Sequence, residues 1–507
     1  MARAFTRRTF TNAVAAGACA LGQAGCGTAR AGAAEPAGRQ NPNIIFILAD
    51  DLGWGELGCY GQAKIRTPSI DKLAAEGMRF TQCYSGSPVC APSRCTLLTG
   101  LHTGHAYIRD NDELPERGDV WGDPAFEGQR PILPGTFTLG VMLKAQGYAT
   151  AAIGKWGLGG PGSTGEPLAQ GFDRFNGYLC QRAAHNYYPT YLWRDRAKDV
   201  LANPAFAAHQ RLPAGKDPND PASYAGYRGT QWAPDLMAEE ALRFIRAHRD
   251  RPFFLYLAFP VPHVALQVPE DSLREYEGAF PETPYTGTAG YLPHRTPRAC
   301  YAAMVTRMDR HVGRVMALLE ELGIERRTAV FASSDNGPTF NGGTDSAFFG
   351  SAGPFRGLKA SLYEGGIRVP MIVRWPGRVA PGAVTNHVAA FWDVMPTLAG
   401  MAGAPAPPGI DGVSFLPQLL GGESSAAPRA LYWEYHATPS QAVRLGRWKG
   451  VRFNKKRSTD APIELYDIEA DIGEKTDLAS RRPDVVTEIE KAMATRTVSP
   501  VKAWNWV

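Results

Sequence analysis

The sequence predicts an α/β protein: a large, mostly parallel mixed sheet sandwiched by helices, followed by a smaller C-terminal α+β domain with an antiparallel sheet. Short apolar runs alternate with amphipathic helical segments along most of the chain. The apolar runs are continuous, as in strands that are buried on both faces. Beyond the Pro/Gly/Ala-rich stretches 401–412 and 421–428 the pattern changes to closely spaced strands.

The first strand is expected at 43–51, NIIFILADD, whose apolar residues suit the centre of a parallel sheet. A helix is expected at 69–77, opened by Ser69 and stopped by Gly77. The same alternation predicts helix, turn and strand at 136–156 and 234–260, a helix at 301–323, and strands at 328–334 and 368–377.

Three long stretches rich in Pro, Gly and aromatic residues, 157–233, 260–298 and 338–366, are expected to be loops over one edge of the sheet. Loops of this length usually build a site. The large domain is predicted to span 41–420. The small domain is predicted at 429–507, with antiparallel strands and a closing helix at 483–496.

The N-terminus is typical of a twin-arginine signal peptide over residues 1–31, with Arg7 and Arg8 before a weakly apolar Ala/Gly run. We therefore expect export to the periplasm or the exterior; a disordered basic tail is the alternative. After residue 40 no apolar stretch approaches ~20 residues, so the body is not expected to be transmembrane.

The net charge of +5 comes mostly from this N-terminal segment, which holds four arginines and no acid. Without those arginines the chain has 50 basic and 49 acidic residues. A near-neutral body gives no electrostatic reason to expect nucleic acid as a partner. Six cysteines follow the segment and none forms a C-x-x-C pair, so a zinc site is not expected.

Oxygen-bearing side chains follow two of the predicted strands. Asp50 and Asp51 end the first strand, and Asp335 and Asn336 end the strand at 328–334. Ligands of open α/β sheets gather beyond the carboxyl ends of the strands. Carboxylate and amide oxygens without His or thiolate company suit a hard cation, Ca²⁺ or Mg²⁺. Each pair by itself is more often a cap or a turn.

The segment SPVCAPSRCTLLTG, 87–100, combines Cys90, Pro92, Ser93 and Arg94 at the start of a predicted helix. A residue there faces free backbone N–H groups and the positive end of the helix dipole. With Arg94 nearby, this environment is expected to activate a thiolate or hold an anion. A buried structural cysteine is the alternative.

CAPSRCTLLTG resembles the C-x-P-S-R-x-x-x-L-T-G signature of the type I sulfatases, members of the alkaline-phosphatase-like superfamily. Further similar motifs follow in the family's order over roughly residues 41–480: ADDLGWGELGCYG (49–61), GKWGLG (154–159), PH (262–263), SSDNG (333–337), LKASLYEGGIRVP (358–370) and LYDIEADIGEKTDLA (465–479). Several motifs in register make chance agreement improbable.

The resemblance implies that a maturation enzyme oxidises Cys90 to Cα-formylglycine, which is hydrated in the site. One hydroxyl would attack sulfur and expel the alcohol; loss of a proton from the other would then eject sulfate. Arg94 would stabilise the formylglycine hydrate, and Lys155 and Lys359 would bind the sulfate group. His263 would protonate the leaving alcohol. The implied ligands of the single cation are Asp50, Asp51, Cys90, Asp335 and Asn336.

One position departs from the family pattern. Many relatives read G-K-W-H-L-G, with a histidine that touches the formylglycine, and here Gly157 stands in its place. A glycine cannot transfer a proton, so the role is unfilled or has moved. His105 and His185 are the candidates to replace it or to line the substrate pocket.

The expected substrate is a carbohydrate or aryl sulfate, because HNYYPTYLWR (185–194) is dense in aromatic residues, as sugar- and aryl-binding loops often are. Phosphonate monoester and phosphodiester hydrolases of the same fold also use formylglycine and remain an alternative. A non-catalytic glycan-binding protein is a second alternative. Two-zinc phosphatases of the superfamily are less favoured, because Asn336 stands where they have a histidine.

Overall fold

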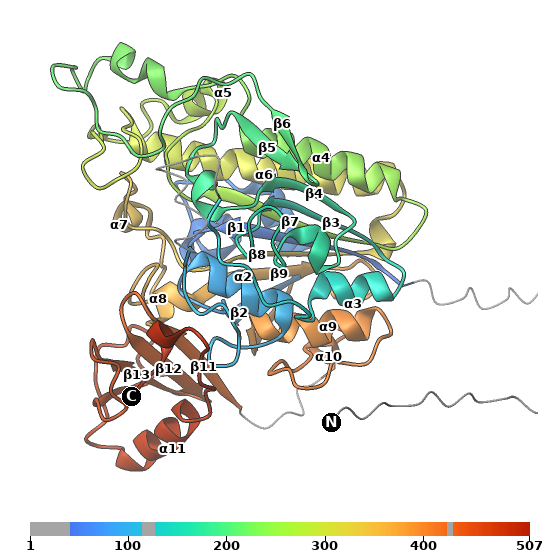
Figure 1. Ribbon diagram of the computed structural model, residues 1–507, viewed down its shortest axis with the longest axis vertical. Helices are drawn as coiled ribbons and strands as arrows, with labels where there is room; N and C mark the ends of the chain where they lie inside the picture. Colours follow the sequence, from blue (N-terminus) through green and yellow to red (C-terminus); the bar gives the residue numbers. More distant parts are fainter. Residues whose placement is uncertain (1–40, 114–126, 423–428) are drawn as a thin grey trace, which may run out of the picture. The chain divides into compact units, whose positions relative to one another are not determined.

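In the part of the chain that the computed structural model describes, residues 41–113, 127–422 and 429–507, ten strands form one sheet in the order β10-β2-β9-β8-β1-β7-β3-β4-β5-β6 (Figure 1). β1 (Asn43–Asp50) lies between β7 (Phe253–Pro262) and β8 (Thr328–Ser334) and pairs with both in parallel. All eight residues of β1 are buried. The predicted central, parallel first strand is therefore confirmed.

The sheet is mixed and mostly parallel, as the sequence predicts. β3 (Ala149–Lys155) extends it in parallel beyond β7, and β9 (Arg368–Arg374) pairs antiparallel with β8. The remaining strands are β2 (Met78–Tyr84), β4 (Arg174–Tyr178), β5 (Tyr191–Arg194), β6 (Ala197–Val200) and β10 (Ala383–Ala390). Within this sheet, β5 and β9 run against the other strands.

Helices cover both faces of the sheet. Successive side chains of β1 point to opposite faces, and because all of them are apolar or buried, both faces need a covering layer. Ile45 and Ile47 share a core cluster with α1 (Pro68–Ala75), α4 (Ala233–Ala247) and α6 (Pro297–Glu321). Ile44, Phe46 and Leu48 share the opposite cluster with α2 (Cys90–Thr99), α3 (Leu139–Ala145) and α9 (Val394–Met401). The predicted helices at 69–77, 234 onward and 301–323 lie on the first of these faces.

The prediction of loops over 157–233 is partly wrong, because β4, β5 and β6 lie there and extend the sheet. β2 and β10 were not predicted either. Buried and partly exposed residues follow one another irregularly in both strands, so neither strand shows the continuous apolar run of a central strand. Short helices complete this part of the fold: α5 (Glu270–Leu273), α7 (Ser346–Phe349), α8 (Glu364–Ile367) and α10 (Leu416–Leu419).

The C-terminal part forms the predicted antiparallel sheet, β11 (Ala430–Tyr435), β12 (Ser440–Leu445), β13 (Trp448–Phe453) and β14 (Ile463–Asp467). α11 (Pro483–Met493) covers one face through Val485, Ile489 and Met493 (Figure 1). Trp433, on the other face, shares a cluster with Tyr84 of β2.

The described residues from 41 onward form one compact unit, and the cluster of Trp433 and Tyr84 joins its two sheets. The domain boundary predicted between 420 and 429 stays a prediction, because residues 423–428 lie outside the described residues. The predicted signal peptide lies outside them as well. No helix in the described ranges is long and apolar enough to cross a membrane.

Candidate active site

The predicted site residues meet at one edge of the large sheet, where the parallel strands β1, β3, β7 and β8 end. Asp50 is the last residue of β1, Lys155 ends β3, and Asp335 directly follows β8. His263 directly follows β7, and Cys90 begins α2 beside them. Neighbouring parallel strands bring their carboxyl ends to the same edge, so residues far apart in the sequence become neighbours.

Cys90 occupies the first position of α2 and is 2% exposed. Its Sγ donates to Asp50 Oδ1 over 3.2 Å and lies 4.0 Å from Asp51 Oδ1. The N–H of Ala91, the next residue of the helix, donates to Asn111 Oδ1 over 3.0 Å. The side chain of residue 90 is therefore held at the helix start, facing the carboxylates.

The unmodified thiol is not activated. Burial, followed by the charge of Asp50, raises the pKa of the Cys90 thiol, although Lys155 and Lys359 oppose this effect. The expectation that this helix start activates a thiolate is therefore not met by the unmodified thiol, since burial, the largest cause, favours its protonated form. A thiol held protonated is a poor nucleophile.

Arg94 ties three strand ends together from one turn further along α2. Its Nε and Nη2 donate to Asp335 Oδ2 over 3.0 and 2.7 Å, and its Nη1 donates to the carbonyl oxygen of Lys155 over 2.5 Å. Nη2 also lies 3.7 Å from Asp50 Oδ2. Its side chain is 0% exposed, so these partners replace all of its water contacts.

Lys155 and Lys359 each contact one of the two adjacent aspartates. Lys155 Nζ donates to Asp50 Oδ2 over 2.5 Å, and Lys359 Nζ donates to Asp51 Oδ2 over 2.7 Å. Burial alone would raise the pKa of Asp50, but Lys155, with His263 and Arg94, holds it well below its usual range. Asp50 is thus a permanent anion at the centre of the cluster.

Asp335 differs from Asp50 although both are buried. Burial and the adjacent charge of Asp50 raise the pKa of Asp335 to about 7, despite its contacts with Arg94. Two carboxylates so close together cannot both be ionised cheaply unless additional positive charge joins them. This electrostatic arrangement suits a cation site.

The oxygen donors of the cluster fit a hard cation. Asn336 Nδ2 donates to Asp51 Oδ1 over 2.7 Å, while the buried Oδ1 of Asn336 has no hydrogen-bond partner within the described part of the chain. The backbone N–H of Asp51 donates to Asp335 Oδ1 over 3.1 Å. Asp51 adopts a φ of 66°, in the left-handed region that costs a non-glycine residue energy. Asp50, Asp51, Asp335 and Asn336 together provide carboxylate and amide oxygens, the donors that Ca²⁺ and Mg²⁺ prefer.

His263 completes the cluster from the end of β7. Its Nδ1 bonds to the carbonyl oxygen of Val264 over 2.5 Å, and its Nε2 lies 3.7 Å from Asp51 Oδ2. Burial and the charge of Lys359 lower the pKa of His263 to about 4. His185, from the 3₁₀-helix η5 (Gln181–His185), stacks on His263 with ring centroids 4.8 Å apart.

A cavity of about 450 Å³ opens above this cluster. Cys90, Lys155, His185, His263 and Lys359 all line it. Four of its further lining residues, none of which was predicted, are Asn111, Gln181, Tyr291 and Phe340. These lie in segments where no local pattern distinguishes a site residue from a loop residue.

His105 does not belong to this site, which corrects the prediction. Its Nδ1 bonds to Asp411 Oδ1 over 2.8 Å and its Nε2 to the carbonyl oxygen of Thr495 over 3.0 Å. It lines a different, mainly apolar cavity with Leu133 and Phe137. Both ring nitrogens are occupied by structural partners, so His105 cannot serve the chemistry at Cys90.

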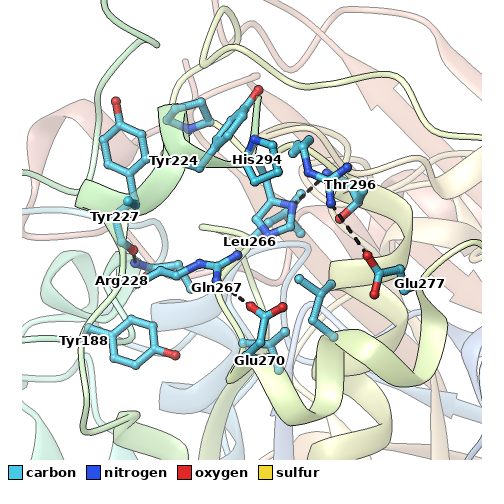
Figure 2. A pocket seen from close by; sticks show the side chains of 16 residues that line it. Tyr188, Tyr224, Tyr227, Arg228, Leu266, Gln267, Glu270, Glu277, His294 and Thr296 are labelled. Carbon is cyan, nitrogen blue, oxygen red and sulfur yellow. Dashed lines mark hydrogen bonds and ion pairs between the residues drawn. The ribbon is translucent and has the colours of Figure 1, made fainter. Parts of the chain in front are cut away.

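A smaller cavity of about 250 Å³ holds none of the predicted site residues (Figure 2). Tyrosines and charged side chains line it. Its charges pair with one another: Arg228 contacts Glu270, and Arg295 Nη2 lies 3.9 Å from Glu277 Oε1. His294 Nδ1 accepts from the N–H of Thr296 over 3.1 Å. These charged groups pair with one another, and none of the residues predicted for the site lies here.

Comparison with known proteins agrees with this geometry. The family model described as Sulfatase matches residues 42–404, and the model for the C-terminal part of N-sulphoglucosamine sulphohydrolase matches residues 357–499. Steryl-sulfatase of Mus musculus is 34% identical over 476 residues, covering 83% of this chain and 72% of that protein. Arylsulfatase A of Homo sapiens is 32% identical over 493 residues, covering 91% and 88% of the two chains.

Solved structures show the same relationship. The crystal structure of Ps i-CgsB in complex with k-i-k-neocarrahexaose has a TM-score of 0.72 and 26% identity, and the match covers 92% of this chain and 93% of that one. The phosphonate monoester hydrolase of Agrobacterium radiobacter, at 19% identity and a TM-score of 0.59, shares the fold. The chain therefore belongs to the type I sulfatases, the sulfuric ester hydrolases of the alkaline-phosphatase-like superfamily.

Proposed function

We propose that this sulfatase hydrolyses a carbohydrate or aryl sulfate monoester with a formylglycine hydrate made from Cys90 and a single divalent cation, Ca²⁺ or Mg²⁺. The observation that carries the proposal is the convergence, in one buried cluster, of Cys90 with three aspartates, Asn336 and two lysines. The proposal includes a maturation enzyme as a partner, because formylglycine forms only by oxidation of the Cys90 side chain.

Asp50, Asp51, Asp335 and Asn336 would hold the cation, together with residue 90. The unpartnered, buried Oδ1 of Asn336 supports this role, since a buried acceptor without a donor is otherwise costly. When bound, a divalent cation would neutralise sulfate oxygens and lower the pKa of a hydroxyl group next to it.

Lys155 and Lys359 are proposed to hold the sulfate group. Each ammonium group contacts one aspartate and keeps further N–H donors that can face the cavity. The pKa of Lys155 is raised, because Asp50 outweighs the effect of burial, and Asp51 does the same for Lys359. Both side chains therefore stay cationic over the working range of an enzyme.

His263 is proposed as the general acid for the leaving alcohol. In the neutral ring, Nδ1–H donates to the carbonyl oxygen of Val264, which leaves Nε2 facing the site. Its pKa is about 4 even with Asp51 nearby, so His263 needs further negative charge beside it to take up a proton. The sulfate ester itself supplies that negative charge when it enters the cavity.

A carbohydrate is the favoured alcohol. Aromatic rings of Tyr291, Phe340 and Tyr435 line the cavity that holds Cys90, and Phe340 is 55% exposed. Such rings bind the apolar faces of sugars. The N-acetylgalactosamine-6-O-sulfatase of Bacteroides thetaiotaomicron, 28% identical over 518 residues, covers 90% of this chain and 93% of that one, and its name indicates a sugar sulfate. The predicted export would give access to such a substrate outside the cell.

The test begins with protein that is co-expressed with a maturation enzyme. Mass spectrometry of the intact peptide around Cys90 is expected to show the mass deficit of thiol-to-aldehyde conversion. Paired assays with an aryl sulfate and an aryl phosphonate monoester are expected to favour the sulfate. Full turnover by Cys90→Ala, or preference for the phosphonate monoester, would contradict the proposal.

A further inference from the structure

The active-site cavity contains a buried carboxamide that the proposed mechanism does not use. Gln181, the first residue of η5, lines the cavity together with Cys90, Lys155 and His263. Its side chain lies almost entirely inside the protein, with 6% of the residue exposed. Its Oε1 is buried and has no hydrogen-bond partner among the described residues.

This carboxamide lies over Gly157, two residues after Lys155. A Cβ atom built on Gly157 would lie 3.5 Å from Gln181 Oε1 and 4.0 Å from the Cβ of Ala91. The space beside Gly157 is thus bordered by Gln181 Oε1 and by the side chain of Ala91, the residue that follows Cys90. A φ of 83° at Gly157 disfavours any side chain there, so no side chain of residue 157 competes for this space.

The position of the carboxamide is set by the surrounding backbone. The N–H of Gln181 donates to Gln129 Oε1 over 3.2 Å. The N–H of Gly157 donates to the carbonyl oxygen of Leu179 over 3.1 Å, which holds the two segments side by side. Gln181 Oε1 is therefore presented at a defined place, as a group that recognises a ligand must be.

An acceptor without a donor destabilises a buried site unless a ligand supplies the donor. The sulfate group of a monoester carries only acceptor oxygens at neutral pH, so it cannot be the partner. The groups of the proposed reaction that carry a hydrogen-bond donor and no charge are hydroxyl groups. Two hydroxyl sources fit the proposed reaction: the hydrate on residue 90, and the sugar hydroxyl beside the sulfated carbon.

We infer that Gln181 is a further residue of this active site, whose Oε1 accepts a hydrogen bond from a hydroxyl group of the reacting complex in the space that Gly157 leaves free. The inference rests on the proposed function. A carboxamide can neither take up nor release a proton here, so Gln181 positions that hydroxyl and does not act as a base.

Gln181→Met tests the inference, because methionine has nearly the same length and carries no hydrogen-bonding amide. We expect kcat/KM to fall roughly ten- to hundredfold, the usual effect of losing one hydrogen bond to a ligand. The Tm is expected to stay equal or to rise, since the variant removes an unpaired buried acceptor. Gln181→Glu keeps an acceptor at the same length but places a negative charge near the sulfate, so its loss is expected to be larger.

Gln170→Met is the matched control. Gln170 also has a buried Oε1 that finds no partner in the described ranges, but it lies outside the cavity and its Nε2 donates to the carbonyl oxygen of Thr164 over 2.6 Å. Losing that bond is expected to lower the Tm and leave kcat/KM unchanged. Rates of all variants are divided by the fraction of converted residue 90, measured by mass spectrometry.

The two hydroxyl sources are separated by substrate. An equal loss with 4-nitrophenyl sulfate and with a sulfated hexose assigns the donor to residue 90, and a loss with the sugar alone assigns it to the substrate. Unchanged kcat/KM with both substrates, or a loss accompanied by a Tm drop like that of Gln170→Met, overturns the inference. Converted wild-type protein that hydrolyses no sulfate ester would instead refute the proposed function, while the Tm of Gln181→Met would still report on the unpaired acceptor.

Discussion

Arg94→Met is the sharpest test of how the site is assembled, because one side chain holds the ends of several strands. Methionine preserves much of the apolar volume of arginine and removes its charge and all of its donors. Asp335 would lose both bonds, of 3.0 and 2.7 Å, and the carbonyl of Lys155 would lose its 2.5 Å bond. None of these groups can turn to water, since Asp335 and Arg94 are both 0% exposed.

The expected cost follows from this burial. Removing one partner of a buried ion pair costs about 3–5 kcal/mol, because the other charge stays behind. Without Arg94 the pKa of Asp335, already raised to about 7, rises further. The carboxyl group then binds a proton, which reduces the loss of folding free energy. In a chain of this length, roughly 1–2 °C of Tm corresponds to each kcal/mol, so a loss of about 3–10 °C is expected.

The assay is thermal unfolding of unconverted protein by circular dichroism, so that stability is measured apart from turnover. Arg94→Lys is the matched control, because it keeps the charge but cannot make the paired bonds to Asp335, and it should fall between wild type and Arg94→Met. A Tm of Arg94→Met within 1 °C of wild type would refute the reasoning that this ion pair holds the strand ends together.

Three further predictions follow from the same geometry. His263→Ala should lower kcat on a sugar sulfate by about 10²–10⁴ and much less on 4-nitrophenyl sulfate, whose leaving group needs little protonation; equal losses would contradict the general-acid role. Dialysis against a chelator should abolish turnover and lower the Tm, and Ca²⁺ or Mg²⁺ should restore both; full activity after verified ion removal would refute the cation site. The hydrogen bond to Asp411 raises the pKa of His105 in the folded protein. The ion pair between these two residues therefore stabilises the fold fully below the unfolded pKa of histidine, about 6.5. This stabilisation is lost as the pH rises through the folded pKa. His105→Gln should therefore lower the Tm at pH 5.5 more than at pH 9 while kcat/KM is unchanged, and a Tm loss independent of pH would contradict that account.

Local patterns predicted the centre of the fold well. The apolar run of β1 identified a central strand, and the helical spacing of apolar residues identified α4 and α6. β2 and β10 were missed, because their partly exposed residues hide the strand pattern. Such strands form because a neighbouring strand pairs with them, which a local sequence window does not contain.

The site residues also fall into those that a local sequence pattern predicted and those that it did not. Asp50, Asp51, Asp335 and Asn336 were predicted from their places at strand ends, and parallel neighbours necessarily bring those ends together. His105 was assigned to the site only because of its residue type. Its partner Asp411 lies 306 positions away in the sequence, and no local signal indicates that pairing. Gln181 carried no signal at all in the sequence.

The sequence by itself determined the alternation of strands and helices, the polar residues that end the central strands, and the family signature around Cys90, because each is written in residues close together along the chain. Tertiary structure decided which side chains face Cys90, which histidine lies beside His263, and that the thiol stays protonated. Those outcomes depend on burial and on contacts between residues that are far apart in the sequence. Asp50 and Cys90 are 40 positions apart, and Asp51 and Asn336 are 285 positions apart. Distances between such residues exist only once the chain has folded.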